Sequence, residues 1–218
     1  SGLGLFSGSM VAFFGVPSFV ASLGMMMVAS GLAYMLSGGQ SIYQVPPSFE
    51  WLGRGDDLVG IPNAVVLMVI LYLFAHLIMS RTVAGRQIYA VGGNPEAARL
   101  SGVPVRRILL SVYAGCGALA GLGGIVMASQ FRSGDPKYGL MYELYVIAAV
   151  VVGGSSLSGG RGKVFGTLIG AFIIAVIQNG MNLTGVQSYT QKVVLGLVLL
   201  SAVLLDLLKK RGWKLNSN

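Results

Sequence analysis

The sequence predicts an all-α fold, a polytopic bundle of about six transmembrane helices. Hydrophobic residues make up 54% of the 218 residues and charged residues only 10%, whereas a soluble chain carries about a quarter charged residues because its surface faces water. The mean hydropathy is +0.75. Several uncharged stretches are long enough to cross a bilayer, which needs roughly 20 mainly apolar residues per helix.

Six apolar stretches are candidate membrane segments within one membrane domain over 1–208, which a basic tail over 209–218 follows. Segment 144–158 is short because Gly153 and Gly154 interrupt it, so it either crosses the membrane or re-enters it as a half-helix. We interpret the apolar stretch over 3–16 as the tail of a truncated span and expect N-terminal spans to be missing. The six segments are 18–36, 63–79, 108–130, 144–158, 164–184 and 188–208.

The positions of lysine and arginine predict the orientation of these segments. Cytoplasmic loops are enriched in both residues, and most of the 15 basic residues lie in three places, 81–107, 154–163 and 209–218. We therefore expect these three places, including the C-terminus, to be cytoplasmic. The connections expected on the outer side are 37–61, 131–143 and 184–191.

Residues that could carry catalysis or bind a metal do not cluster. His76 is the single histidine, whereas a metal site needs several convergent ligands and a nucleophile needs an oriented base. The run 159–163 lacks the Gly and Ser/Thr of a phosphate loop, because Leu157 and Val164 stand there. Cys116 has no partner for an intramolecular disulfide. We expect no catalytic, cofactor-binding or metal-binding residue and, because the basic residues lie between apolar segments, no nucleic-acid partner.

Glycines at four-residue spacing predict close contacts between helices. In lipid, small residues let two helix backbones approach and gain dispersion contacts. We interpret these glycines as packing positions without a substrate role. They are Gly117 with Gly121, and Gly162 with Gly166 and Gly170.

The connection 81–107 contains a predicted short helix. Asn94 can cap its first amides, and Pro95 suits the first helical position. Glu96 lies near the positive end of the helix dipole, and Gly102 can adopt the left-handed conformation that ends a helix. A helix of roughly 10 Å is too short to be stable alone. Either it is an ordinary cytoplasmic turn, or its small residues offer a partner a close approach.

Over nearly its whole length the chain resembles the permeases of ribose- and xylose-type ABC importers of bacteria. The resemblance rests on three stretches in order, GRQIYAVGGNPEAARLSGV, YELYVIAAVVVGGSSLSGGRGKVFGTLIGA and NGMNLTGVQSY, and on PSFVASLGMMMVASGLAYMLSGGQSI before them. In that family two permease copies form the pathway, and cytoplasmic ATPase subunits bind ATP and Mg²⁺. A periplasmic or lipid-anchored binding protein delivers the sugar.

The resemblance implies a permease subunit for a monosaccharide in the bacterial inner membrane, with no cofactor in this chain. It also implies that the connection after the second segment is a coupling loop that docks onto the ATPase. The residues assigned to this loop are Gly85, Arg86, Gly92, Asn94, Glu96, Ala97, Ala98, Arg99, Ser101 and Gly102.

Neutral polar residues near the outer end of segment 164–184 are candidates for a sugar pathway. They are Gln178, Asn179 and Asn182. Amides suit an uncharged polyol, and positions 179 and 182 share a helix face. The alternative is that these side chains satisfy backbone groups at a helix end.

Three other functions remain open. An ion-coupled secondary transporter usually carries ionisable residues within the membrane, and here only His76, Glu143 and Asp206 come near that depth. A branched-chain amino acid or other small-solute ABC permease is poorly separated from a sugar permease by sequence physics. A membrane anchor that transports nothing would leave the polar groups in the spans unexplained.

Overall fold

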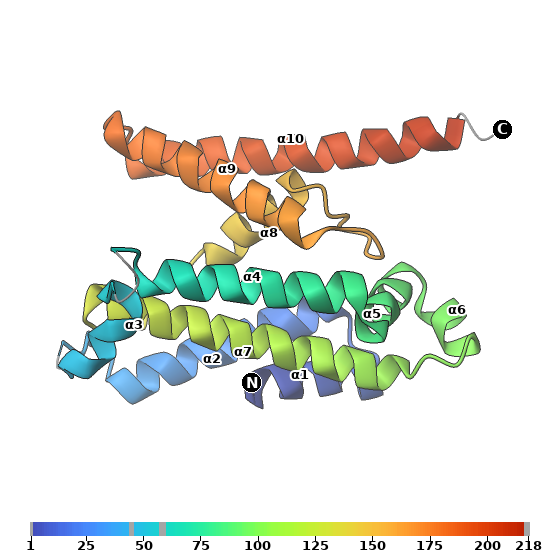
Figure 1. The fold of residues 1–218 in the computed structure, drawn as a ribbon, viewed down its shortest axis with the longest axis horizontal. Helices are drawn as coiled ribbons and strands as arrows, with labels where there is room; N and C mark the ends of the chain where they lie inside the picture. The colour runs from blue at the N-terminus through green and yellow to red at the C-terminus, as the bar shows by residue number, and fades with distance from the viewer. Residues whose placement is uncertain (1, 44–45, 57–59, 216–218) are drawn as a thin grey trace. The chain divides into compact units, whose positions relative to one another are not determined.

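The computed structural model describes residues 2–43, 46–56 and 60–215 and confirms the all-α prediction (Figure 1). Within these residues the β-structure consists of isolated bridge residues, among them the antiparallel pair Ile42 and Gly134. The helices are α1 (Gly2–Phe14), α2 (Ser18–Ser37), η1 (Pro47–Glu50), α3 (Trp51–Arg54), α4 (Asn63–Arg81), α5 (Val83–Gly93), α6 (Pro95–Leu100), α7 (Val105–Phe131), α8 (Tyr142–Val152), α9 (Val164–Leu183) and α10 (Ser188–Leu215).

Among the described residues four helices, α2, α4, α7 and α9, are long and apolar enough to cross a membrane. Each coincides with a predicted segment. The shorter apolar helices are α1, α8 and the part of α10 over Ser188–Leu204. α10 continues to Leu215, so the predicted boundary at 208 falls inside a helix.

The segment predicted over 144–158 is helical only as far as Val152. The 11 residues of α8 rise about 16 Å, roughly half the hydrocarbon thickness. Gly153 ends the helix, because Gly154 turns the chain with a φ of 83°. The rest of the segment, through Ser158, is not helical.

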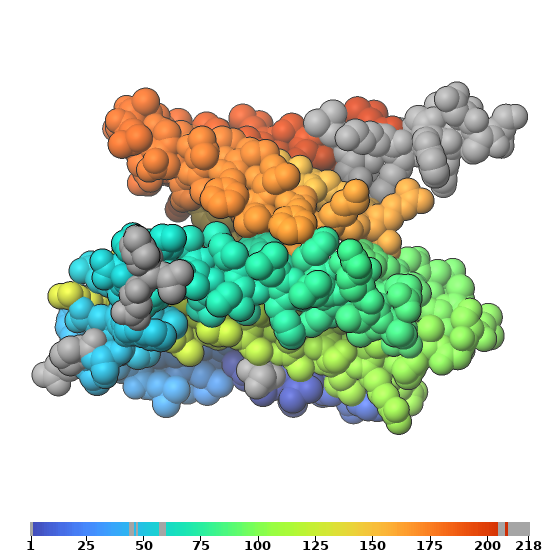
Figure 2. Space-filling model, viewed as in Figure 1, coloured from blue at the N-terminus to red at the C-terminus, as the bar shows by residue number. Residues whose placement is uncertain are grey.

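Most large apolar side chains lie on the surface of the chain, as lipid-facing helices require. Phe14, Leu36 and Val176 are 73%, 87% and 69% exposed. Side chains of α9 lie at the surface in the view of Figure 2. An exposed apolar surface of this extent indicates contact with lipid or with further protein.

The chain divides into two compact units, residues 1–73 with 95–139 and residues 74–94 with 140–218. In the first unit α1 runs antiparallel along α7. Gly8 faces Tyr113, where an added Cβ would lie 2.8 Å from the tyrosine Cβ, and the Arg106 guanidinium lies 5.5 Å from the Phe13 ring centre. Gly4 packs on Gly117, whereas a Cβ on Gly121 would meet no described atom within 4 Å.

In the second unit α8 packs on α9 and α10 around a small apolar core. The core residues are Ala148, Ala149, Ile174 and Leu195. Gly166 faces the carbonyl of Gly153, and a Cβ on Gly170 would lie 2.8 Å from the Gly153 nitrogen. Gly162 precedes the first residue of α9, so it belongs to the loop rather than to a helical glycine stripe. The rings of His76 and Phe165 are 4.6 Å apart, which makes the histidine a packed residue.

Candidate functional site

The connection after α4 begins with a tight reversal of the chain. The Thr82 hydroxyl accepts a hydrogen bond from the Gly85 N–H at 3.3 Å and so caps α5. Gly85 is buried against the end of α4, where a Cβ would lie 2.6 Å from Met79 Cα. Sequence reasoning missed α5, although a threonine such as Thr82 is a preferred N-cap residue.

The short helix predicted after Asn94 is present as α6. At its end the Gly102 N–H donates to the Arg99 carbonyl and the Val103 N–H donates to the Ala98 carbonyl, both at 3.0 Å. With Gly102 at a φ of 81°, these two bonds form a Schellman motif. Six residues give a helix of about 9 Å. The Asn94 N–H donates to Ala90 as the last bond of α5.

The two alanines of α6 lie in different environments. Ala98 is 5% exposed and packs inside the chain, whereas Ala97 is on the surface and Leu100 is 86% exposed. Ala98 is therefore not available to a partner, contrary to what the sequence reading implied for the pair. The exposed side of α6, called the α6 face below, consists of Glu96, Ala97, Arg99 and Leu100. Leu100 was missed by sequence reasoning.

The other predicted coupling residues lie on or near these helices. Arg86 is exposed on α5. The Ser101 hydroxyl donates to the Ala97 carbonyl at 3.0 Å. Gly92 lies at the end of α5 against the loop that joins α8 to α9, where a Cβ would be 2.9 Å from the Gly160 nitrogen.

The proposed sugar residues lie in the last turns of α9, which ends at Leu183. Asn182 accepts a hydrogen bond from Gln191 Nε2 at 2.9 Å, and the same nitrogen donates to the Val186 carbonyl at 2.8 Å. This arrangement ties Asn182 to the turn between α9 and α10 through the Gln191 side chain, and it is Gln191 rather than Asn182 that bonds to a backbone group. Gln178 is half-buried and Asn179 is exposed. A cavity of about 80 Å³ between α8 and α10 has a mainly apolar lining that includes none of these three residues.

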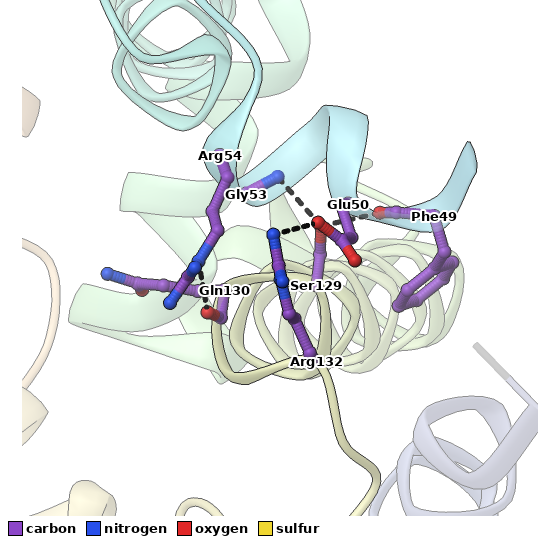
Figure 3. A network of polar contacts seen from close by, with 7 residues as sticks. All are labelled: Phe49, Glu50, Gly53, Arg54, Ser129, Gln130 and Arg132. Atoms are coloured by element: carbon purple, nitrogen blue, oxygen red, sulfur yellow. Dashed lines mark hydrogen bonds and ion pairs between the residues drawn. The ribbon is translucent and has the colours of Figure 1, made fainter. Parts of the chain in front are cut away.

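A polar network that sequence reasoning missed holds the segment from Phe49 to Arg54 on the end of α7 (Figure 3). Ser129 is fully buried. Its hydroxyl donates to the Phe49 carbonyl at 2.6 Å and accepts from the Gly53 N–H at 2.7 Å. Gly53 is required there, because a Cβ would lie 2.8 Å from the Ser129 carbonyl carbon.

Two arginines extend this network at the surface. Arg54 Nε donates to the Gln130 carbonyl at 3.0 Å. Arg132 Nη2 lies 2.5 Å from Glu50 Oε2. Because the Arg132 side chain is 55% exposed, solvent screens this ion pair and its contribution to stability is small. The buried Ser129 bonds matter more.

A second tether joins the same two connections. Ile42 and Gly134 exchange backbone hydrogen bonds at 2.8 and 2.9 Å, and the Ser41 hydroxyl donates to Asp135 Oδ2 at 2.6 Å. The hydrogen bond from Ser41, and then that from the Lys137 N–H, lower the pKa of Asp135. A lowered pKa means that the hydrogen bonds to the ionised Asp135 stabilise the fold above the usual carboxyl range, and that this contribution is lost as pH falls through the lowered value.

Membrane-length helices linked by a capped two-helix connection define a polytopic membrane protein. The family model described as "branched-chain amino acid transport system / permease component" matches residues 1–203. The chain belongs to this family, which confirms the resemblance to ABC permeases.

Named relatives are similar over most of this chain. The ribose import permease protein RbsC of Escherichia coli K12 is 43% identical over 94% of this chain and 64% of its own length. RbsC of Bacillus subtilis is 44% identical over 86% of this chain and 59% of its own. The L-arabinose transport system permease protein AraH of Escherichia coli is 38% identical over 94% and 62%. The chain thus spans about three fifths of these relatives. No solved structure matches.

Proposed function

We propose that this chain is part of the membrane-spanning permease subunit of an ABC importer that carries a monosaccharide. The observation that carries the proposal is the identity of 38–44% with relatives named as ribose and arabinose permeases. The partner ATPase binds ATP and Mg²⁺ and hydrolyses the nucleotide. A second permease copy completes the pathway, and a periplasmic or lipid-anchored binding protein supplies the sugar.

In this proposal the α6 face docks onto the ATPase. Two backbone hydrogen bonds cap the C-terminal end of this short helix and stabilise its conformation for docking to a partner. Leu100 supplies exposed apolar area, and Glu96 and Arg99 supply charges of both signs. Ala97 lets the partner approach the helix backbone closely. Arg86 on α5 is a further exposed contact.

Loop contacts support the proposed orientation of the subunit. Within the first unit, residues 41–54 bond to residues 129–135, which agrees with both connections lying outside. Within the second unit, the Tyr89 hydroxyl bonds to the Gly162 carbonyl. This bond agrees with connections 81–107 and 154–163 both being cytoplasmic. In this proposal segment 144–158 joins the two sides, so that α8 and the residues after it cross the membrane. The parity of the helices gives a cytoplasmic C-terminus in the inner membrane.

The sugar pathway is proposed at the outer half of α9. Gln178 and Asn179 carry neutral amides that can bond to sugar hydroxyls without a charge to neutralise. Asn182 shapes the pathway through its bond to Gln191 rather than by facing the sugar.

The test is uptake by proteoliposomes that contain the full-length permease, its ATPase and its binding protein. We expect ATP-dependent accumulation of ribose, arabinose or xylose and none of leucine. Accumulation of leucine instead would favour an amino acid permease, which the description of the family also suggests. Uptake driven by a proton or sodium gradient without ATP would favour a secondary transporter.

A further inference from the structure

The loop over residues 153–163, called the glycine loop below, joins α8 to α9 and touches the end of α5. Its sequence resembles a phosphate loop only superficially, and the proposed function gives it no role. All of its contacts described here lie within the second unit.

One end of the glycine loop is fixed to α5. Tyr89 Oη donates a hydrogen bond to the Gly162 carbonyl at 2.8 Å. The backbones of Gly92 and Gly93 meet those of Gly159 and Gly160 without intervening side chains. A Cβ on Gly160 would lie 2.7 Å from Gly93 Cα. Each contact is between backbone atoms or through one hydroxyl, so little slack separates α5 from the loop.

The glycine loop is also closed on itself and fixed to α8. The Ser156 N–H donates to the Arg161 carbonyl at 2.9 Å. The Ser155 N–H donates to the Val150 carbonyl at 3.0 Å, and the Gly154 N–H donates to the Val151 carbonyl at 2.9 Å. The loop therefore continues the end of α8 as one hydrogen-bonded piece.

Beyond the loop, α8 and α9 are in backbone contact. Gly166 faces the Gly153 carbonyl, and Gly170 faces the Ala149 carbonyl. Close-packed contacts transmit a displacement because they cannot be compressed. An unbroken series of such contacts therefore leads from Tyr89 and Gly92 on α5 to the facing backbones of α8 and α9.

We propose that the glycine loop is the link that passes a displacement of α5 to α8 and α9, with the Tyr89 hydroxyl as its positioning group. The proposal rests on the proposed function, in which an ATPase moves the connection that contains α5. Tyr89 acts through Gly162 and touches neither sugar nor nucleotide in this scheme.

Two variants break the link in different ways. Tyr89→Phe removes the hydroxyl and keeps the ring. Gly160→Ala adds a methyl group that collides with Gly93. The matched controls are Tyr43→Phe, at a 77% exposed tyrosine, and Gly139→Ala, where φ is 81° against 73° at Gly160 but nothing lies within 4 Å of the added Cβ. The glycine control thus reproduces the backbone strain without the collision.

The experiment uses the full-length permease with its ATPase and binding protein in proteoliposomes. It measures the sugar imported per ATP hydrolysed and the ATPase that co-purifies with the permease. Both variants should keep the ATPase bound, and the import ratio should fall about threefold or more, the range expected from losing one hydrogen bond. The double variant should be no worse than Gly160→Ala alone, because both changes break one link.

An import ratio unchanged in both Tyr89→Phe and Gly160→Ala would overturn the link. Loss of the ATPase from the Tyr89→Phe complex would also overturn it, because the hydroxyl would then support assembly rather than transmission. Absence of ATP-dependent sugar uptake by the unmodified proteins would instead contradict the proposed function, so the two failures are distinguishable.

Discussion

Two hydroxyl groups, those of Ser129 and Tyr89, hold connections between membrane segments in place. Each does so by bonding to backbone groups rather than by forming an ion pair. Ser129 satisfies a carbonyl and an N–H at once, and Tyr89 satisfies a carbonyl from a distant part of the chain. A buried backbone group without a partner is costly, more so than the small gain from an exposed ion pair. Replacing one hydroxyl is therefore a sharper test than replacing a charge.

Ser129→Ala should loosen the segment that lies on the end of α7. The change leaves the Phe49 carbonyl and the Gly53 N–H without their partner, at a cost of about 1–3 kcal/mol. Hydrogen exchange at residues 49–54 should accelerate. Ser22→Ala is the control, because the Ser22 hydroxyl bonds only within its own helix and is exposed. Unchanged exchange in Ser129→Ala would contradict the assignment.

The alanine pair of α6 allows docking to be separated from folding. Ala97→Glu places a charge on the exposed face, so the protein should purify normally and bind its ATPase poorly. Ala98→Glu forces a charge into a buried site and should destabilise the fold by about 3 kcal/mol or more. Melting temperature and ATPase co-purification check both. Normal ATPase binding by Ala97→Glu would refute the docking role of the α6 face.

Sequence reasoning reached different depths for different residues. It located α6 because Asn94, Pro95 and Gly102 are local signals read within a few positions. It did not find that Ala98 is buried and Ala97 exposed, since that depends on which side of a six-residue helix packs. The hydrogen bond from Ser129 to Phe49 spans 80 residues of sequence, and a local sequence pattern does not predict such a contact.

At the scale of helices, length and apolar composition predicted the ends of α2, α4, α7 and α9 to within three residues. The prediction was weaker for α8, because glycine doublets allow a helix to end or to continue. The glycines of α7 and α9 were predicted to bring backbones together. The structure gives Gly166 and Gly170 such a position, whereas a Cβ on Gly121 would meet no described atom within 4 Å.

Gly166→Leu should push α8 away from α9, since the glycine faces the Gly153 carbonyl with no room for a side chain. The expected loss is about 1–3 kcal/mol, as for other overpacked cores. The control is Gly180→Leu in the same helix, where nothing described lies within 4 Å of a Cβ. Equal melting temperatures of the two variants in detergent would show that the contact between α8 and α9 contributes nothing.

For the whole molecule, composition alone was sufficient to predict a membrane bundle, because a chain with 10% charged residues cannot cover itself with water-compatible surface. Composition does not give the order of sides. Which connection lies on which side of the membrane is predicted from the distribution of lysine and arginine among the connections. The structure adds hydrogen bonds that join pairs of connections. The tether of Ile42 to Gly134 and the bond of Tyr89 to Gly162 group the connections as the charge bias does.

Cysteine labelling tests this order of sides directly. In a background with Cys116 replaced by serine, single cysteines are placed at Asp56, Arg99 and Arg161. An impermeant maleimide should label position 56 from outside, and positions 99 and 161 only after the cytoplasmic side is opened. Position 161 decides whether α8 crosses. If it were labelled from outside together with position 56, α8 would re-enter, and the bond from Tyr89 to Gly162 would have to join segments on opposite sides of a membrane, which a 2.8 Å contact forbids.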